Sequence, residues 1–263
     1  MSLAPSAAPV RPSAEPTPTP TVDRTPTPTV EPSPSPTVEP SPTDLARPLP
    51  ECRYADRPTR HAEQDSWRIT LLDPIFRLSS EYVPERLVST TRAGLQAGYE
   101  VRPEVVDDLR AMAEASRTAD AEIAVRWAYR GYGEQAGAFA YWTRQAGYER
   151  ALRISARPGH SEHQLGTALD FRSADSLRAP WDYDDWGETP AGTWMRQNSW
   201  RYGFVLSYPR GMSEETCYDY EPWHFRYVGR QLAAAVHESG RSLRRYLWEN
   251  PPAVLTGGCR HPR

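Results

Sequence analysis

A proline repeat near the N-terminus limits what the first part of this chain can fold into. An eight-residue unit recurs from residue 17 to 43 as TPTPTVDR, TPTPTVEP and SPSPTVEP, and breaks off at SPT. Proline at every second position fixes φ and removes backbone donors, so neither a helix nor a sheet ladder can form. We expect residues 1–50 to be a disordered Pro/Thr/Ser-rich stalk of extended, polyproline-like character. Its composition suits a spacer, and a tail without a role is the alternative.

The folded part is therefore predicted to span residues 51–263. Fifteen of the 27 prolines precede it, whereas all nine tryptophans lie within it, so one well-packed domain is possible. The net charge of −3 provides no basic field that would attract nucleic acid. No apolar run approaches the roughly 20 residues of a membrane span. The start, Met1 to Pro5, has no apolar h-region, so the chain as given is not expected to be a secretion precursor.

Three cysteines, Cys52, Cys217 and Cys259, allow one disulfide and one leftover thiol. Their spacing matches neither a zinc knuckle nor a redox CxxC motif. The spacing does not decide which two of them pair, and three unpaired thiols are an equal alternative.

Helical and strand patterns alternate after residues 52–98, which we expect to form an irregular arm with a short strand that wraps the domain. Val105, Leu109 and Met112 lie on one face of a predicted helix that begins at Pro103. From Ile123, alternating residues predict a half-buried strand that delivers Arg130 at its end. Further helices are predicted over residues 133–146, 189–202, 231–238 and 242–248, and strands over 167–171, 204–208 and 223–228. A surface loop is predicted over 181–188 and a loop over 209–216. We expect an α+β fold whose antiparallel sheet carries the functional site on one face and helices on the other.

The segment HSEHQLGTALD contains two candidate metal ligands, His163 and Asp170. A catalytic zinc ion takes three protein ligands and leaves one position open. His224, in the segment EPWH, is the candidate third ligand, and Glu221 of the same segment is the candidate catalytic base. Pro222 prevents a regular ladder, so Glu221 is expected on the loop that enters the strand. Glu221 in an ordinary salt bridge, and histidines that only pack or face solvent, are the alternatives.

Three further residues near these motifs have open roles. Arg130 could grip a carboxylate or a developing oxyanion through paired hydrogen bonds, or it could be one of many exposed arginines. Ser161 could brace the loop through its hydroxyl or only satisfy a turn. His160 could support the metal site or contact substrate, and an ordinary surface position is equally compatible with the sequence.

These motifs resemble a known enzyme family. PGHSEHQLGTALDF is similar to the SxHxxGxAxD signature of VanY-type D-alanyl-D-alanine carboxypeptidases, and EPWHFRYVG to their second signature. The segments LLDPIFRLSSEYVPERLV, AYRGYGEQ and YGFVLSYP also resemble this family, so the similarity runs from about Leu71 to Leu247. The resemblance implies the compact α+β domain shared by lysostaphin-type and hedgehog-type zinc proteins.

The resemblance also implies roles for individual residues. One zinc ion would be bound by His163, Asp170 and His224, with Glu221 as general base. Arg130 would bind substrate near the scissile carbonyl, and Gln135 would lie on the substrate side. With Ser161, these two residues are the candidates for substrate binding. Many relatives carry serine where this chain has Trp127 and Gly131, and this difference affects the fine substrate contacts.

The function implied is a zinc-dependent D,D-carboxypeptidase that removes the C-terminal D-alanine from peptidoglycan stem peptides. An L,D-carboxypeptidase acting on tetrapeptide stems and a non-catalytic, zinc-containing module that binds cell wall are the alternatives. We expect a monomer that works outside the cytoplasm, secreted or anchored at the cell wall. Its partner would be the stem peptide, with no nucleic acid, and its export segment is not present in this chain.

Overall fold

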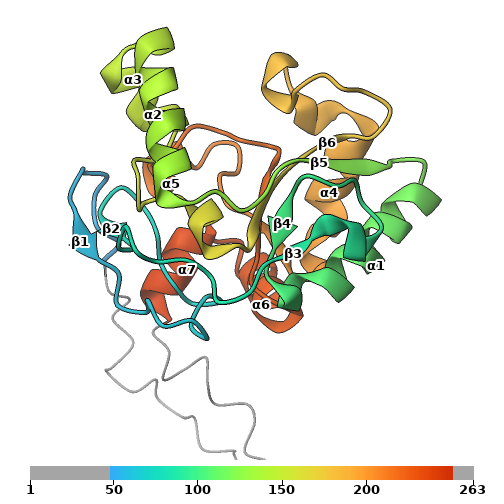
Figure 1. The fold of residues 1–263 in the computed structure, drawn as a ribbon, viewed down its shortest axis with the longest axis horizontal. Coiled ribbons are helices and arrows are strands. Elements are labelled where there is room, and N and C mark those ends of the chain that lie inside the picture. The colour runs from blue at the N-terminus through green and yellow to red at the C-terminus, as the bar shows by residue number, and fades with distance from the viewer. Residues whose placement is uncertain (1–47, 251–263) are drawn as a thin grey trace, which may run out of the picture. The chain divides into compact units, whose positions relative to one another are not determined.

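The structure, a computed structural model, describes residues 48–250 (Figure 1). Almost all of the predicted stalk over residues 1–50 lies outside the described residues. The end of the predicted domain, residues 251–263, also lies outside them, and Cys259 with it.

A four-stranded antiparallel sheet organises the described part of the chain. Its strand order is β5-β6-β8-β7, and every pair in it is antiparallel, as the sequence predicts. The strands are β5 (Ile123–Trp127), β6 (Ala168–Ser173), β7 (Phe204–Leu206) and β8 (His224–Tyr227). Two short pairs lie outside this sheet, β1 (Arg57–Pro58) with β2 (Phe76–Arg77), and β3 (Val88–Ser89) with β4 (Glu100–Val101).

The helices follow the predicted order, with two additions. They are α1 (Val106–Thr118), α2 (Tyr132–Ala146), α3 (Tyr148–Ile154), α4 (Pro190–Asn198), α5 (Ser213–Thr216), α6 (Arg230–Ser239) and α7 (Leu243–Glu249). The sequence prediction missed α3, which starts directly after Gly147 closes α2, and the single turn α5 within the predicted loop over residues 209–216.

The two faces of the sheet differ in chemistry because side chains alternate along each strand. Phe171 of β6 contacts Phe225 of β8 edge to face, with ring centroids 6.0 Å apart. These rings belong to one buried cluster with Leu109 of α1 and Met195 of α4. On the opposite face of the central strands lie Asp170 and other polar side chains. The predicted α+β arrangement, with helices on one face, is confirmed.

One predicted surface loop is not wholly at the surface. Within the segment over residues 181–188, the Trp186 side chain is fully buried. Its indole N–H donates a hydrogen bond to Ser173 Oγ over 3.2 Å, and its ring packs in the main core cluster. The large apolar area of one tryptophan therefore outweighs the polar character of the neighbouring aspartates.

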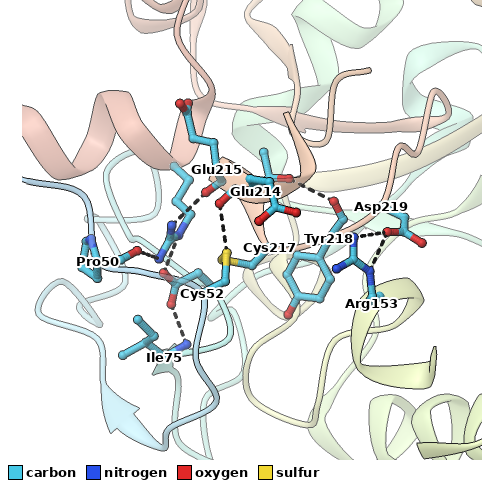
Figure 2. Close-up of a disulfide and its surroundings, with 12 residues drawn as sticks. Pro50, Cys52, Ile75, Arg153, Glu214, Glu215, Cys217, Tyr218 and Asp219 are labelled. Carbon is cyan, nitrogen blue, oxygen red and sulfur yellow. Dashed lines mark hydrogen bonds and ion pairs between the residues drawn. A yellow bond between two sulfur atoms is a disulfide. The ribbon is translucent and has the colours of Figure 1, made fainter. Parts of the chain in front are cut away.

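A disulfide ties the N-terminal arm to the segment that follows α5. Cys52 and Cys217 are joined across a sequence separation of 165 (Figure 2). Beside this disulfide, the buried Arg244 of α7 donates to Asp73 of the arm over 2.7 Å. The open pairing is thus resolved as Cys52 with Cys217. The irregular arm over residues 52–98 is confirmed, and it contains the short strands β1, β2 and β3 where one short strand was predicted.

Within residues 48–250, no helix has both the length and the apolar character needed to cross a membrane.

Candidate active site

The three predicted metal ligands converge on one point of the sheet. His163 lies in a 3-10 turn over Glu162–Leu165, while Asp170 of β6 and His224 of β8 are direct cross-strand partners. Asp170 Oδ2 lies 3.3 Å from His163 Nε2, and Asp170 Oδ1 lies 3.0 Å from His224 Nδ1. One ligand atom from each of the three lies within 4.8 Å of the others. All three side chains are buried, so this is a preformed cluster.

Local sequence explains how His163 reaches the sheet. Ser161 caps the turn, since its hydroxyl accepts a hydrogen bond from the His163 backbone N–H over 3.4 Å. Gly166 ends the turn with φ +73°, and a Cβ there would lie 3.1 Å from the Leu87 side chain. Only glycine adopts this conformation at little cost in so narrow a space. The hydroxyl of Ser161 thus braces the loop, while a substrate contact remains a prediction.

Hydrogen bonds fix which imidazole nitrogens face Asp170. His163 Nδ1 donates to the Ala128 carbonyl over 2.7 Å, so its Nε2 is directed at the carboxylate. His224 Nε2 donates to Glu162 Oε2 over 3.0 Å, so its Nδ1 is directed at the same carboxylate. Such outer hydrogen bonds orient metal-ligating histidines in proteins.

Glu162 is a site residue that the sequence interpretation missed. Its carboxylate accepts hydrogen bonds from Ser207 Oγ at 2.6 Å and from Arg226 Nη1 at 3.0 Å, in addition to His224. The only sequence signal for this role was that Glu162 is an acidic residue next to His163 in the motif. Sequence spacing does not show which partner that acid meets.

The ionisation of the cluster follows from burial and charge. For Asp170, burial opposes ionisation, but His163 and His224 outweigh it and hold the pKa well below its usual range. For Glu162, burial is likewise outweighed, chiefly by Arg226, and the pKa falls to about 2. Burial lowers the pKa of His163. The hydrogen bonds of His224 to both carboxylates overcome its burial and raise its pKa to about 10.

Glu221 lies on the loop that enters β8, as predicted. Its carbonyl accepts the His224 backbone N–H over 3.1 Å, and its own N–H donates to Tyr208 O over 3.1 Å. Burial and the nearby Asp170 raise the pKa of Glu221 to about 8, against the opposing effects of His224 and Arg130. A carboxyl group whose pKa is raised close to neutral pH is suited to proton transfer.

Arg130 and Gln135 form a connected pair beside this carboxyl. Arg130 Nε donates to Gln135 Oε1 over 2.6 Å, and Gln135 Nε2 donates to the Ala156 carbonyl over 2.6 Å. Burial lowers the pKa of Arg130, whereas Asp170 and Glu221 act to raise it. The Gln135 side chain is fully buried and holds Arg130 in place. A direct contact between Gln135 and substrate remains a prediction.

A cavity of about 830 Å³ gives access to these groups. Its lining includes the three candidate ligands together with Glu221, Arg130 and Ser161. Tryptophans and tyrosines form much of the remaining wall: Trp127, Trp142, Trp181, Trp223, Tyr129, Tyr141, Tyr208, Tyr218 and Tyr220.

His160 neither supports the metal site, nor lines the cavity, nor lies at the surface. Its buried ring bonds the Asp73 carbonyl through Nδ1 at 2.7 Å and Asp56 Oδ1 through Nε2 at 3.0 Å. Both partners belong to the arm, so His160 joins the arm to the motif loop.

Comparison with known sequences places this geometry in a family. Residues 98–230 match the VanY family, described as D-alanyl-D-alanine carboxypeptidase. The chain is 32% identical over 185 residues to the YodJ protein of Bacillus subtilis, covering 68% of this chain and 66% of that protein. It is 35% identical over 119 residues to a D-alanyl-D-alanine carboxypeptidase of Enterococcus faecium, covering 45% of this chain and 34% of that one. The match thus spans less than two thirds of either relative.

Solved structures show the same fold. The LdcB LD-carboxypeptidase superposes with a TM-score of 0.60 at 30% identity, over 68% of this chain and 85% of that one. A Glu-to-Ala variant of the D,D-pentapeptidase VanY, in complex with Zn(II), gives a TM-score of 0.58 at 26% identity, over 69% of this chain and 99% of that one. With a family match over half of its length and solved relatives of the same fold, the chain belongs to the VanY family of D-alanyl-D-alanine carboxypeptidases.

Proposed function

We propose that this protein is a zinc-dependent D,D-carboxypeptidase that removes the C-terminal D-alanine from peptidoglycan stem peptides. The observation that carries the proposal is the convergence of His163, Asp170 and His224 within 4.8 Å of one another in a cavity that also holds Glu221 and Arg130. A related VanY enzyme in complex with Zn(II), and a related VanYB in complex with D-alanine-D-alanine, support the choice of metal and substrate.

The donor set fits zinc. Two imidazoles and one carboxylate are common ligands of catalytic zinc, and three protein ligands leave a position for water. His163 would bind through Nε2 and His224 through Nδ1, because Ala128 and Glu162 engage the other two nitrogens. When bound, the ion would supply Lewis-acid polarisation and a lowered pKa for water.

The chain's own residues account for the proton transfers and for the charge. Glu221 accepts a proton from the attacking water and passes it to the amide nitrogen of the departing D-alanine. Arg130, held by Gln135, stabilises the negative charge that develops on the scissile carbonyl oxygen. Both groups are partly buried, and the reduced access of water strengthens these electrostatic effects.

A location outside the cytoplasm is part of the proposal. The Cys52–Cys217 disulfide supports it, since such bonds persist in oxidising compartments. The related LdcB enzyme, whose structure concerns peptidoglycan recognition, supports action on cell wall. The stalk predicted for residues 1–50 suits a spacer between a surface and the catalytic domain.

Mass spectrometry of digested stem peptides tests the proposal. The purified chain is incubated with pentapeptide and, separately, with tetrapeptide, with and without a chelator. We expect chelator-sensitive conversion of pentapeptide to tetrapeptide. Conversion of tetrapeptide to tripeptide alone would replace D,D with L,D specificity. Release from neither peptide by zinc-loaded protein would contradict the catalytic proposal and favour a wall-binding module.

A further inference from the structure

One arginine of the cavity wall has no role in the mechanism above. Arg126, Arg130 and Arg150 all line the cavity. Arg150 forms an ion pair with Asp219, and Arg130 donates to Gln135. Across residues 48–250, the Arg126 side chain contacts aromatic rings but makes no hydrogen bond or ion pair. Arg126 is therefore the one of these three whose guanidinium makes no hydrogen bond or ion pair at all in the described part of the chain.

A β-bulge directs Arg126 toward the cavity. In the pairing of β5 with β6, Val125 is opposite Phe171 and Trp127 is opposite Asp170, so Arg126 is the extra residue between them. An extra residue bends the strand and redirects its side chain, and bulges are frequent next to active sites. This bulge places an arginine in the wall of the cavity that contains the metal ligands.

Two tryptophan rings hold the guanidinium in place. The Arg126 Cζ lies 5.3 Å from the Trp127 ring centroid and 5.1 Å from that of Trp181. Trp181 contacts Trp223, the neighbour of His224, with ring centroids 6.0 Å apart. Contacts over ring faces stabilise the cation and leave its in-plane N–H donors available. The arginine is thus preorganised for a planar anion.

We propose that Arg126, held by Trp127 and Trp181, is a subsite for a carboxylate of the peptide substrate. The inference rests on the proposed function and adds that the preferred substrate is an acidic peptide. A guanidinium binds a carboxylate through two parallel, charge-assisted hydrogen bonds. The cavity of about 830 Å³ has room for several peptide residues beside the metal centre.

A stem peptide offers this chemistry in two places. One is its C-terminal carboxylate, and the other is the α-carboxylate of its γ-linked D-glutamate. Both are planar anions of the same kind, so selective amidation of each identifies the one that Arg126 binds.

Binding is measured by calorimetry in the zinc-loaded Glu221→Ala protein, in which hydrolysis is blocked. The probes are L-Ala-γ-D-Glu-L-Lys-D-Ala-D-Ala and its two singly amidated forms, one at the D-glutamate and one at the C-terminus. We expect Arg126→Gln to weaken binding of the first peptide by about tenfold or more. The amidated peptide that lacks the bound carboxylate should be insensitive to Arg126→Gln.

Arg150→Gln is the matched control, because Arg150 lines the same cavity but is already paired with Asp219. It should shift the affinities of all three peptides equally. Equal effects of Arg126→Gln on all three peptides, or no effect on any, would overturn the subsite. Absence of hydrolysis by the wild-type protein would instead overturn the proposed function, while the binding comparison would still decide the subsite.

Discussion

His224 Nε2 lies 3.0 Å from Glu162 Oε2, and this bond leaves Nδ1 of the same ring facing Asp170. Glu162 is itself held by the fully buried Arg226. The orientation of one candidate ligand thus depends on a chain of charges that continues into the core.

Glu162→Gln should weaken zinc binding by about 10–100-fold, since outer partners of ligating histidines contribute on this scale. The measurement is competition with a chromophoric chelator. Ser207→Ala, which removes only one hydrogen bond to the same carboxylate, is the control and should have a smaller effect. Thermal melts show whether each variant is folded. An unchanged zinc affinity in folded Glu162→Gln protein would contradict the orienting role.

Zinc binding should release protons near pH 7. In the metal-free protein the pKa of His224 is raised to about 10, so the ring carries a proton that the metal must displace. Asp170 is already ionised because its pKa is held low, and His163 is neutral because its pKa is lowered. Calorimetry in buffers of different ionisation enthalpy should show about one proton released or more. Zinc binding without proton release would contradict this ionisation state.

Glu221 should make the metal-free protein less stable as the pH rises. Its pKa is raised to about 8 in the folded state, so the folded state binds more protons than the unfolded state between about pH 4.5 and 8. The free energy of unfolding falls across this window. The melting temperature of metal-free Glu221→Gln protein should therefore be higher than that of the wild type at pH 8 and nearly equal to it at pH 5. Equal differences at both pH values would exclude the raised pKa.

The Cys52–Cys217 disulfide should stabilise the segment that carries Glu221. Cys217 lies four residues before that carboxyl, and the bond closes a loop with a sequence separation of 165 residues. Replacing both cysteines by serine should cost about 2–5 kcal/mol of stability and lower turnover. Cys259→Ser is the control for loss of a thiol. Melting and turnover equal to those of the control would show that the disulfide does not support the site.

Local sequence patterns predicted most of the elements, but not every contact between them. Pro103, Gly147 and the Thr189–Pro190 pair mark helix ends through backbone constraints that depend on neighbouring residues alone. The clustering of His163 and Asp170 with His224 followed from motif chemistry. The pairing of Glu162 with Arg226 and the bulge at Arg126 depend on how β6 registers with its neighbours, which no local pattern specifies.

The most direct test measures zinc content and D-alanine release in the same samples of wild-type, Glu221→Ala and His224→Ala protein. The account predicts one zinc ion per chain and release of D-alanine from pentapeptide for the wild type. Glu221→Ala should keep the zinc and lose release, and His224→Ala should lose both. Near-normal release by Glu221→Ala, or full zinc content in His224→Ala, would contradict the account.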